Sequence, residues 1–125
     1  MTLNQVTLPT LNVGKAILFY ETLGLHLIVR SIPHYARFHC RQGDATFSLH
    51  LLDQLLTGVG AKIYFECNNL DEFVSELVNK GIAFDEMPCD KSWLWREARL
   101  TDPDNNRLIL YNAGKNRLTP PWAIG

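Results

Sequence analysis

The chain has 125 residues, 46% of them hydrophobic, which is enough for one compact domain with a buried core. Its formal net charge of -1 gives no general attraction to nucleic acid or to an anionic membrane, so neither is an expected partner. No apolar run approaches the roughly 20 residues of a membrane span, and no basic and apolar signal region follows Met1, so we expect a soluble, cytoplasmic protein.

The first predicted elements are a strand and a helix. Residues 4–8 alternate polar and apolar side chains, as in a strand with one buried face. Asn12 then precedes an amphipathic helix over 13–23 that stops at Gly24. Asn is a favoured helix N-cap, and Gly readily takes the left-handed conformation that ends a helix. Three strands rich in β-branched, aromatic or alternating residues are predicted to follow, at 25–32, 35–41 and 45–52.

The same pattern then recurs. A strand over 62–67 leads through Asn69 into a helix over 70–80, which stops at Gly81. Three more strands are predicted at 82–86, 93–100 and 107–112, and the turn between the last two reads Asp-Pro-Asp-Asn-Asn. A unit of strand, helix and three strands that is used twice predicts two similar modules related by a pseudo-twofold axis.

Strand alternation assigns the side chains of these strands to two faces. The face toward the helices is expected to be apolar and to carry Val6, Leu8, Phe47, Leu49, Leu51, Ile63, Phe65, Cys67, Leu108 and Leu110. The opposite face is mixed and polar, as a ligand cavity requires, and carries Gln5, Thr7, Ser48, His50, Lys62, Tyr64, Glu66, Arg107, Ile109 and Tyr111. Two further sets have a shared face of unassigned direction: Tyr35, Arg37 and His39 on one strand, and Trp93 and Trp95 on the seventh.

Three segments resemble the vicinal oxygen chelate superfamily, the fold of glyoxalases, bleomycin resistance proteins and extradiol dioxygenases. Residues 6–25 contain its FYxxxLGL run as Phe-Tyr-Glu and Leu-Gly-Leu, and residues 63–73 resemble the start of its second module. Residues 102–110 resemble its DPDGN turn and final strand, with Asn105 in place of the usual Gly. The resemblance implies an α+β fold in which two βαβββ modules form an incomplete mixed β-barrel around a cup-shaped cavity, in a homodimer.

The domain organisation follows from the resemblance. Residues 1–113 are expected to form a single domain, with module 1 at about 1–55 and module 2 at about 60–113, joined by a linker at 55–60. Residues 114–125 form a C-terminal tail, where Pro120-Pro121 argues against a central strand. Trp122 is expected to dock this tail on the body or on a partner chain, with a tail that covers the cavity as the alternative.

Metal-dependent relatives carry a His or Glu ligand on each of four strands. The matching positions here hold Gln5, His50, Lys62 and Ile109. Only His50 is an ordinary ligand, because the ammonium of Lys62 repels a cation and Ile109 has no donor atom. The three cysteines, Cys40, Cys67 and Cys89, are widely spaced without a CxxC pair and do not suggest a thiolate site. We therefore expect no cofactor, with a divalent metal on His50 and ligands such as Glu66 or His39 as the alternative.

His50 and Lys62 are the candidate catalytic residues. His50 is either a general acid or base or a histidine hydrogen-bonded in a polar pocket. Lys62 either pairs with Glu66 or grips a ligand carboxylate or phosphate. Arg37 is either an anion clamp or a solvated charge on an edge strand. Trp93 and Trp95 either stack on a planar ligand or bury a dimer seam.

The predicted function is metal-independent binding of an anionic or neutral small aromatic-type molecule, since Lys62, Arg107 and His50 face a single acidic residue, Glu66. The alternative is an enzyme, a lyase, isomerase or dioxygenase, that uses His50 as base or as metal ligand. A third hypothesis is a dimerising subunit whose cavity is filled by its own aromatic side chains. The expected partners are a second copy of the chain and a small molecule.

Overall fold

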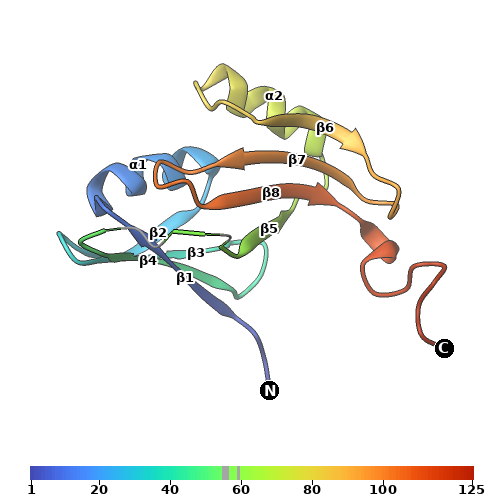
Figure 1. Ribbon diagram of the computed structural model, residues 1–125, viewed down its shortest axis with the longest axis horizontal. Coiled ribbons are helices and arrows are strands. Elements are labelled where there is room, and N and C mark those ends of the chain that lie inside the picture. Colours follow the sequence, from blue (N-terminus) through green and yellow to red (C-terminus); the bar gives the residue numbers. More distant parts are fainter. Residues whose placement is uncertain (55–56, 59) are drawn as a thin grey trace. The chain divides into compact units, whose positions relative to one another are not determined.

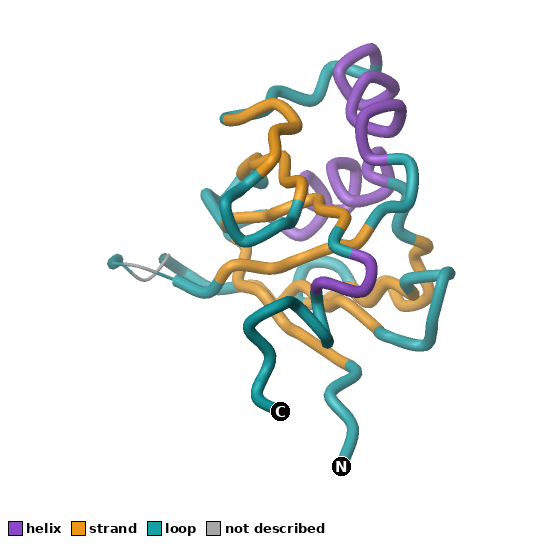
Figure 2. The backbone as a smooth tube through the Cα atoms, turned by 90° about the vertical axis from the view of Figure 1, so that its right-hand side faces the viewer, coloured by secondary structure: helices purple, strands orange, loops and turns teal. Residues whose placement is uncertain are grey.

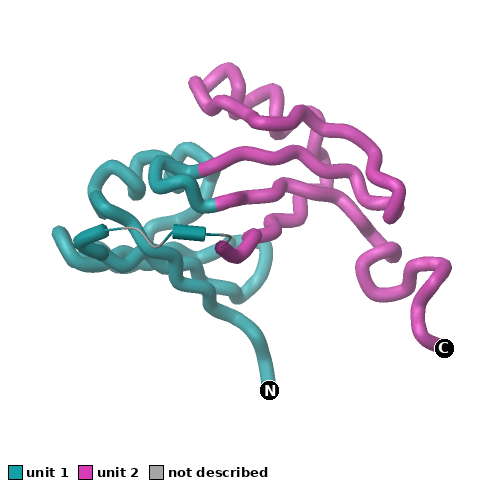
Figure 3. Tube along the Cα trace, in the orientation of Figure 1, with its two compact units in different colours: residues 1–59, 102–106 teal, residues 60–101, 107–125 magenta. Residues whose placement is uncertain are grey.

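The computed structural model describes residues 1–54, 57–58 and 60–125 and divides into two compact units. Unit 1 comprises Met1–Val59 with Asp102–Asn106, and unit 2 comprises Gly60–Thr101 with Arg107–Gly125 (Figure 3). The predicted linker at 55–60 falls partly on Leu55, Leu56 and Val59, which lie outside the described residues. Among the described residues, no helix is long and apolar enough to cross a membrane.

Unit 1 consists of a helix and a mixed four-stranded sheet, sheet A. Its elements are β1 (Gln5–Thr10), α1 (Val13–Leu23), β2 (His26–Ser31), β3 (Tyr35–His39) and β4 (Thr46–Leu51). The strand order is β1-β4-β3-β2, with β1 parallel to β4 and the other pairs antiparallel (Figure 1). The strands therefore form one βαβββ module with an open sheet.

Unit 2 repeats this arrangement in sheet B. Its elements are β5 (Lys62–Glu66), α2 (Leu70–Asn79), β6 (Glu86–Asp90), β7 (Arg96–Thr101) and β8 (Arg107–Asn112). The order is β5-β8-β7-β6, again with the first pair parallel (Figure 1). A 3₁₀ helix, η1 (Gly114–Asn116), follows β8, and the tail beyond it contains no strand (Figure 2). The predicted α+β fold of two βαβββ modules is confirmed.

The predicted helix caps are confirmed in α1 and only partly in α2. The side chain of Asn12 accepts a hydrogen bond of 3.0 Å from the backbone nitrogen of Lys15. Gly24 and Gly81 have φ angles of 104° and 95°, in the region that glycine occupies without strain. Asn69 stands at the start of α2, but its side chain makes no capping hydrogen bond.

Two strand predictions in unit 2 are wrong. The strand expected at 82–86 lies further along the chain, as β6 (Glu86–Asp90). The backbone nitrogen of Ile82 donates to the carbonyl of Leu77 at the end of α2, and pairing with β7 starts only near Glu86. The strand expected at 93–100 starts at Arg96, because Leu94 has a φ of 67° in a turn before it. The two tryptophans therefore do not share a strand face.

The core of unit 1 lies between α1 and sheet A. Tyr20 of α1 packs against Phe38 and Phe47, with ring centroids 5.9 and 4.5 Å apart. Since Phe38 faces α1, its strand neighbours Tyr35 and Arg37 face the opposite way. We call the face of each sheet that is turned away from its helix the open face.

The core of unit 2 alternates along the strands in the same way. The buried apolar side chains of α2 and sheet B are Leu70, Val74, Leu77, Ala98, Leu100, Leu108 and Leu110. Ile109 and Tyr111 are also buried, but they form a separate cluster with Ala113 and Trp95. This second cluster belongs to the open face of sheet B, which is therefore not uniformly polar.

Candidate functional site

The register of sheet A arranges the residues of its open face in rows across the strands. One row contains Gln5 of β1 beside Thr46 of β4, and the next contains Thr7, Ser48 and Arg37. A third row places His50 beside Tyr35. The sequence left the direction of Arg37 open, and the fold assigns it to this face. Strand β3 lies between β4 and β2, so Arg37 is not on an edge strand.

The phenol oxygen of Tyr35 is the centre of a hydrogen-bond network on this face. The Nε of Arg37 donates to it at 2.9 Å, and the hydroxyl of Ser48 lies 2.6 Å away. Burial raises the pKa of Tyr35, but the hydrogen bonds from Ser48 and Arg37 and the positive charge of Arg37 outweigh it, so the pKa is lowered overall. Arg37 and Ser48 are thus held in place by Tyr35, which the sequence grouped with Arg37 and His39 without assigning it this role.

The two histidines of this face differ in their contacts. The Nε2 of His39 lies 2.8 Å from the carbonyl oxygen of Gly43, so this ring is occupied by its own turn. His50 is exposed, and its imidazole makes no hydrogen bond within the described part of the chain. The prediction that His50 acts as an acid, a base or a ligand is not tested by this geometry.

The open face of sheet B carries cations at one end. Lys62 of β5 lies beside Arg107 of β8, and the next row contains Tyr64, Ile109 and Arg99. Arg107 donates from one terminal nitrogen to the carbonyl of Gly60 at 3.1 Å. Neither Lys62 nor Arg107 forms an ion pair with a described residue. The positive charge at this end is therefore not neutralised.

The middle of the same face is aromatic. Trp95 and Tyr111 stack with ring centroids 4.7 Å apart, and Tyr64 contacts both rings edge-on. The Nε1 of Trp95 donates to the carbonyl of Asn116 at 3.1 Å, which fixes η1 to the cluster. Tyr64 remains 43% exposed. Trp95 and Tyr111 therefore pack internally, while part of the Tyr64 ring remains free for a ligand.

The predicted ion pair between Lys62 and Glu66 is not formed. The carboxylate of Glu66 instead accepts hydrogen bonds of 3.0 and 3.2 Å from the backbone nitrogens of Ala113 and Gly114. The Nε of Arg117 lies 3.7 Å from its other oxygen. Glu66 thus anchors the start of the tail. Trp122, expected to dock the tail on the body or on a partner chain, is 58% exposed in the single chain.

The sequence interpretation missed a buried carboxylate on this face. Glu97 of β7 is 1% exposed, accepts a hydrogen bond of 2.7 Å from the Nε1 of Trp93, and pairs with Arg99 at 3.2 Å. A signal was present, because Glu97 and Arg99 alternate with the apolar Ala98 and Leu100. The predicted strand began at residue 93, so its face was assigned from Trp93 and Trp95 and Glu97 was not considered.

The four metal-ligand positions of the family do not hold a donor set that fits a metal. Ile109 is buried and has no donor atom, Lys62 is a cation, and the Oε1 of Gln5 accepts a hydrogen bond of 2.7 Å from Thr46. The register also makes Ser48, rather than His50, the counterpart of Ile109, since Gln5 pairs with Thr46 as Lys62 pairs with Arg107. A serine hydroxyl is a weaker ligand for a divalent ion than the imidazole of His50.

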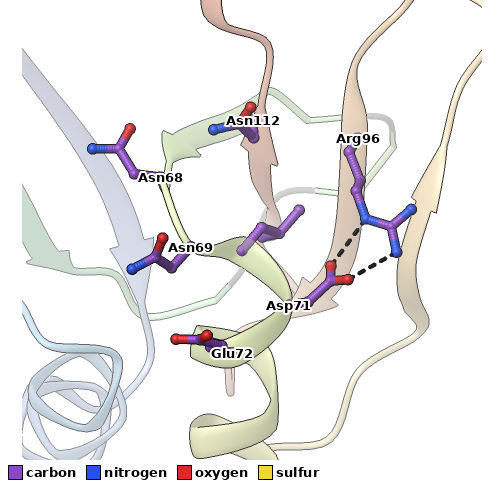
Figure 4. Close-up of a pocket in the computed structure, with 7 residues that line it drawn as sticks. Asn68, Asn69, Asp71, Glu72, Arg96 and Asn112 are labelled. Atoms are coloured by element: carbon purple, nitrogen blue, oxygen red, sulfur yellow. Dashed lines mark hydrogen bonds and ion pairs between the residues drawn. The ribbon is translucent and has the colours of Figure 1, made fainter.

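A shallow pocket of about 310 Å³ lies at the start of α2 (Figure 4). It is lined by Asn68, Asn69, Leu70, Asp71, Glu72, Arg96 and Asn112. The carboxylate of Asp71 accepts two hydrogen bonds from Arg96, at 2.9 and 3.0 Å, and these hold its pKa below the usual value. None of the predicted site residues lines this pocket, and Asp71 and Arg96 are paired with each other, so the open faces remain the candidate site.

Comparison with known proteins identifies the class to which the chain belongs. A sequence model of the Glyoxalase/Bleomycin resistance protein/Dioxygenase superfamily matches residues 2–110, and the chain is a member of that superfamily. Among curated proteins no sequence matches. The fold resemblance inferred from the sequence is therefore confirmed.

Solved structures agree with this assignment. A glyoxalase/bleomycin resistance protein/dioxygenase from Nocardioides has a TM-score of 0.80 and 20% identity, over 100% of this chain and 90% of that one. Lactoylglutathione lyase from Agrobacterium tumefaciens has a TM-score of 0.75 and 14% identity, over 98% and 97% of the two chains. A bleomycin-binding protein complexed with bleomycin has a TM-score of 0.71 and 21% identity, over 90% and 98%. At these identities the similarity establishes the fold alone.

Proposed function

We propose that this protein binds an anionic, partly aromatic small molecule on its open faces without a metal, and that it does so as a homodimer. The observation that carries the proposal is the unneutralised pair of cations, Lys62 and Arg107, side by side at one end of the open face of sheet B. Two adjacent cations without carboxylate partners repel each other, and a bound anion relieves that repulsion.

The charges around this pair favour an anion over a cation. The acidic groups of the face are already engaged, because Glu66 bonds the backbone at Ala113 and Gly114 and Glu97 pairs with Arg99. A cationic ligand would have to displace one of these contacts, whereas a carboxylate or phosphate would find free donors.

The aromatic character follows from the next row of the same face. Tyr64 is partly exposed and lies beside Ile109, so a planar group bound near Lys62 can rest on the tyrosine ring and the apolar side chain. Neutral aromatic molecules would use the same surface with lower affinity, because they do not engage the cations.

An enzyme that uses His50 as base is the second candidate function. It is favoured by the exposure of His50 and by its position beside Tyr35, whose pKa is lowered. If the protein is such an enzyme, His50→Ala should abolish conversion of the substrate, while the variant still binds the anionic ligand.

The first experiment is elemental analysis and native mass spectrometry of untagged protein purified without chelator. Stoichiometric metal that is lost in His50→Ala would overturn the metal-free proposal. Metal-free protein with a co-purifying acidic aromatic molecule, at the mass of a dimer, is the expected result.

Binding is then measured by calorimetry with three probes: benzoate, phenyl phosphate and neutral benzamide. We expect binding of at least one anion to be stronger than that of benzamide, and to be weakened about tenfold or more by Lys62→Gln with Arg107→Gln. The matched control, Lys15→Gln with Arg30→Gln, removes two exposed positive charges elsewhere in unit 1 and should bind like the unsubstituted protein. Equal affinity for all three probes in every variant would refute the proposal.

A further inference from the structure

Arg99 is the only charged residue of the open face of sheet B, within the described chain, that has a buried nitrogen atom without a partner. One terminal nitrogen donates to Glu97 at 3.2 Å, while the Nε is buried and makes no hydrogen bond with a described residue. The side chain is 36% exposed, so the rest of the guanidinium is accessible. Buried N–H groups almost always have a partner in folded proteins. The guanidinium of Arg99 therefore has hydrogen-bonding capacity that the described residues do not use.

Glu97 holds this guanidinium in a defined orientation. Its carboxylate is fixed on one side by the indole nitrogen of Trp93, at 2.7 Å, and contacts Arg99 on the other. Glu97 is 1% exposed, so neither contact is exchanged readily for water. An arginine oriented by a buried carboxylate loses little further side-chain entropy when a ligand binds.

The strand register determines which residues lie on either side of Arg99. It pairs with Ile109, the position at which metal-dependent relatives carry a ligand, and on its other side with Glu86 of β6. Glu86 is engaged by Lys91 and by the thiol of Cys89. In unit 1 the counterpart is Arg37, which pairs with Ser48 as Arg99 pairs with Ile109. Both modules thus place an arginine next to a position that has no metal-binding group.

We propose that Arg99 binds an acidic oxygen of the ligand beside Ile109, through the part of its guanidinium that is exposed. Glu97 acts as its positioning residue and Arg37 is the equivalent arginine of unit 1. The inference rests on the proposed function and deepens it, because it names the group that recognises the anion. Guanidinium donors suit carboxylates and phosphates alike.

The test compares variants of the buried pair. Glu97→Gln retains an oxygen that can accept from Trp93 but loses the oxygen that orients Arg99, so we expect anion affinity to fall a few-fold. The double variant Glu97→Gln with Arg99→Gln leaves no unpaired buried charge, and we expect it to bind at least about tenfold more weakly than Glu97→Gln alone. Benzamide affinity should be the same in both. Circular dichroism and thermal melting show whether each variant is folded.

The outcomes separate this inference from the proposed function. If the unsubstituted protein binds neither benzoate nor phenyl phosphate, the proposed function itself fails. If it binds them and the two variants have equal anion affinity, the role of Arg99 is refuted while Lys62 and Arg107 still account for binding. A loss confined to benzoate identifies a carboxylate as the bound group, and a loss confined to phenyl phosphate identifies a phosphate.

Discussion

Substitution of Tyr20 by Phe removes a single oxygen atom from the core of unit 1. The hydroxyl of Tyr20 donates a hydrogen bond of 2.5 Å to the carboxylate of Asp102, which is 4% exposed. The ring itself keeps its contacts with Phe38 and Phe47, so the packing of the core is unchanged. The loss is therefore that of one hydrogen bond to a buried charge, for which we expect about 1.5–3 kcal/mol.

Asp102 limits this loss because it keeps other donors. Its carboxylate also accepts hydrogen bonds from the backbone nitrogens of Asp104 and Asn106, at 2.8 and 2.9 Å, and from the side-chain amide of Asn106 at 2.8 Å. The charge therefore stays partly solvated by the turn, and Tyr20→Phe should fold. Urea unfolding at pH 8 measures the difference.

The pH dependence of the same variant tests the cause. Burial, followed by the charge and the hydrogen bond of Asp102, raises the pKa of Tyr20 above its ordinary value of 10.0. The folded state thus holds a proton that the unfolded chain releases above pH 10, so this contribution is complete below pH 10 and declines by about 1.4 kcal/mol per pH unit above it. The advantage of the unsubstituted protein over Tyr20→Phe should shrink between pH 10 and pH 11.

The control for this experiment is Tyr64→Phe, which removes a hydroxyl from a partly exposed ring. Its effect on the free energy of unfolding should stay within about 0.5 kcal/mol. A Tyr20→Phe protein as stable as the unsubstituted protein at pH 8, or a difference that is constant up to pH 11, would refute the reasoning.

Three further predictions concern other parts of the molecule. Asn12→Ala should cost about 1 kcal/mol in urea unfolding, and Asn69→Ala much less, because only Asn12 caps its helix with its side chain; equal losses would contradict this. Glu66→Gln should weaken the anchor of the tail, so that trypsin cleaves after Arg117 faster than in the unsubstituted protein, and an unchanged rate would refute the anchoring role. Burial, aided by Glu66, raises the pKa of Cys67 to about 11; in a variant with no other cysteine, alkylation should be slow at pH 8 and quicken toward pH 11 as thiolate forms, whereas fast reaction at pH 8 would show the thiol to be unperturbed.

The elements with strong local signals were predicted well from the sequence. Strand β8 (Arg107–Asn112) has the predicted bounds, because a turn rich in Asp and Asn sets its start. Gly24 and Gly81 have the positive φ angles that the helix ends require. Strand β6 was misplaced because the apolar residues before it pack without strand pairing, and periodicity does not separate these two cases.

The candidate site was harder to predict because its contacts link distant parts of the chain. Glu66 was expected to pair with Lys62 on the same strand face. Its carboxylate instead accepts from the backbone nitrogens of Ala113 and Gly114, and no pattern in the sequence locates those amides. The pairing of Glu97 with Arg99 needed the correct start of β7. The faces could be read from alternation, whereas the partners of individual charges could not.

The turn Asp102–Asn106 has a consequence for the order of assembly. It belongs to unit 1, although the strands on both sides of it belong to unit 2. The hydrogen bond between Tyr20 and Asp102 spans 82 residues, and that from the backbone of Leu11 to Asp104 spans 93. During synthesis these two contacts of unit 1 can therefore form only after most of the second module has left the ribosome. Contacts of such long sequence separation slow folding, so we expect these contacts of unit 1 to form after the rest of the unit.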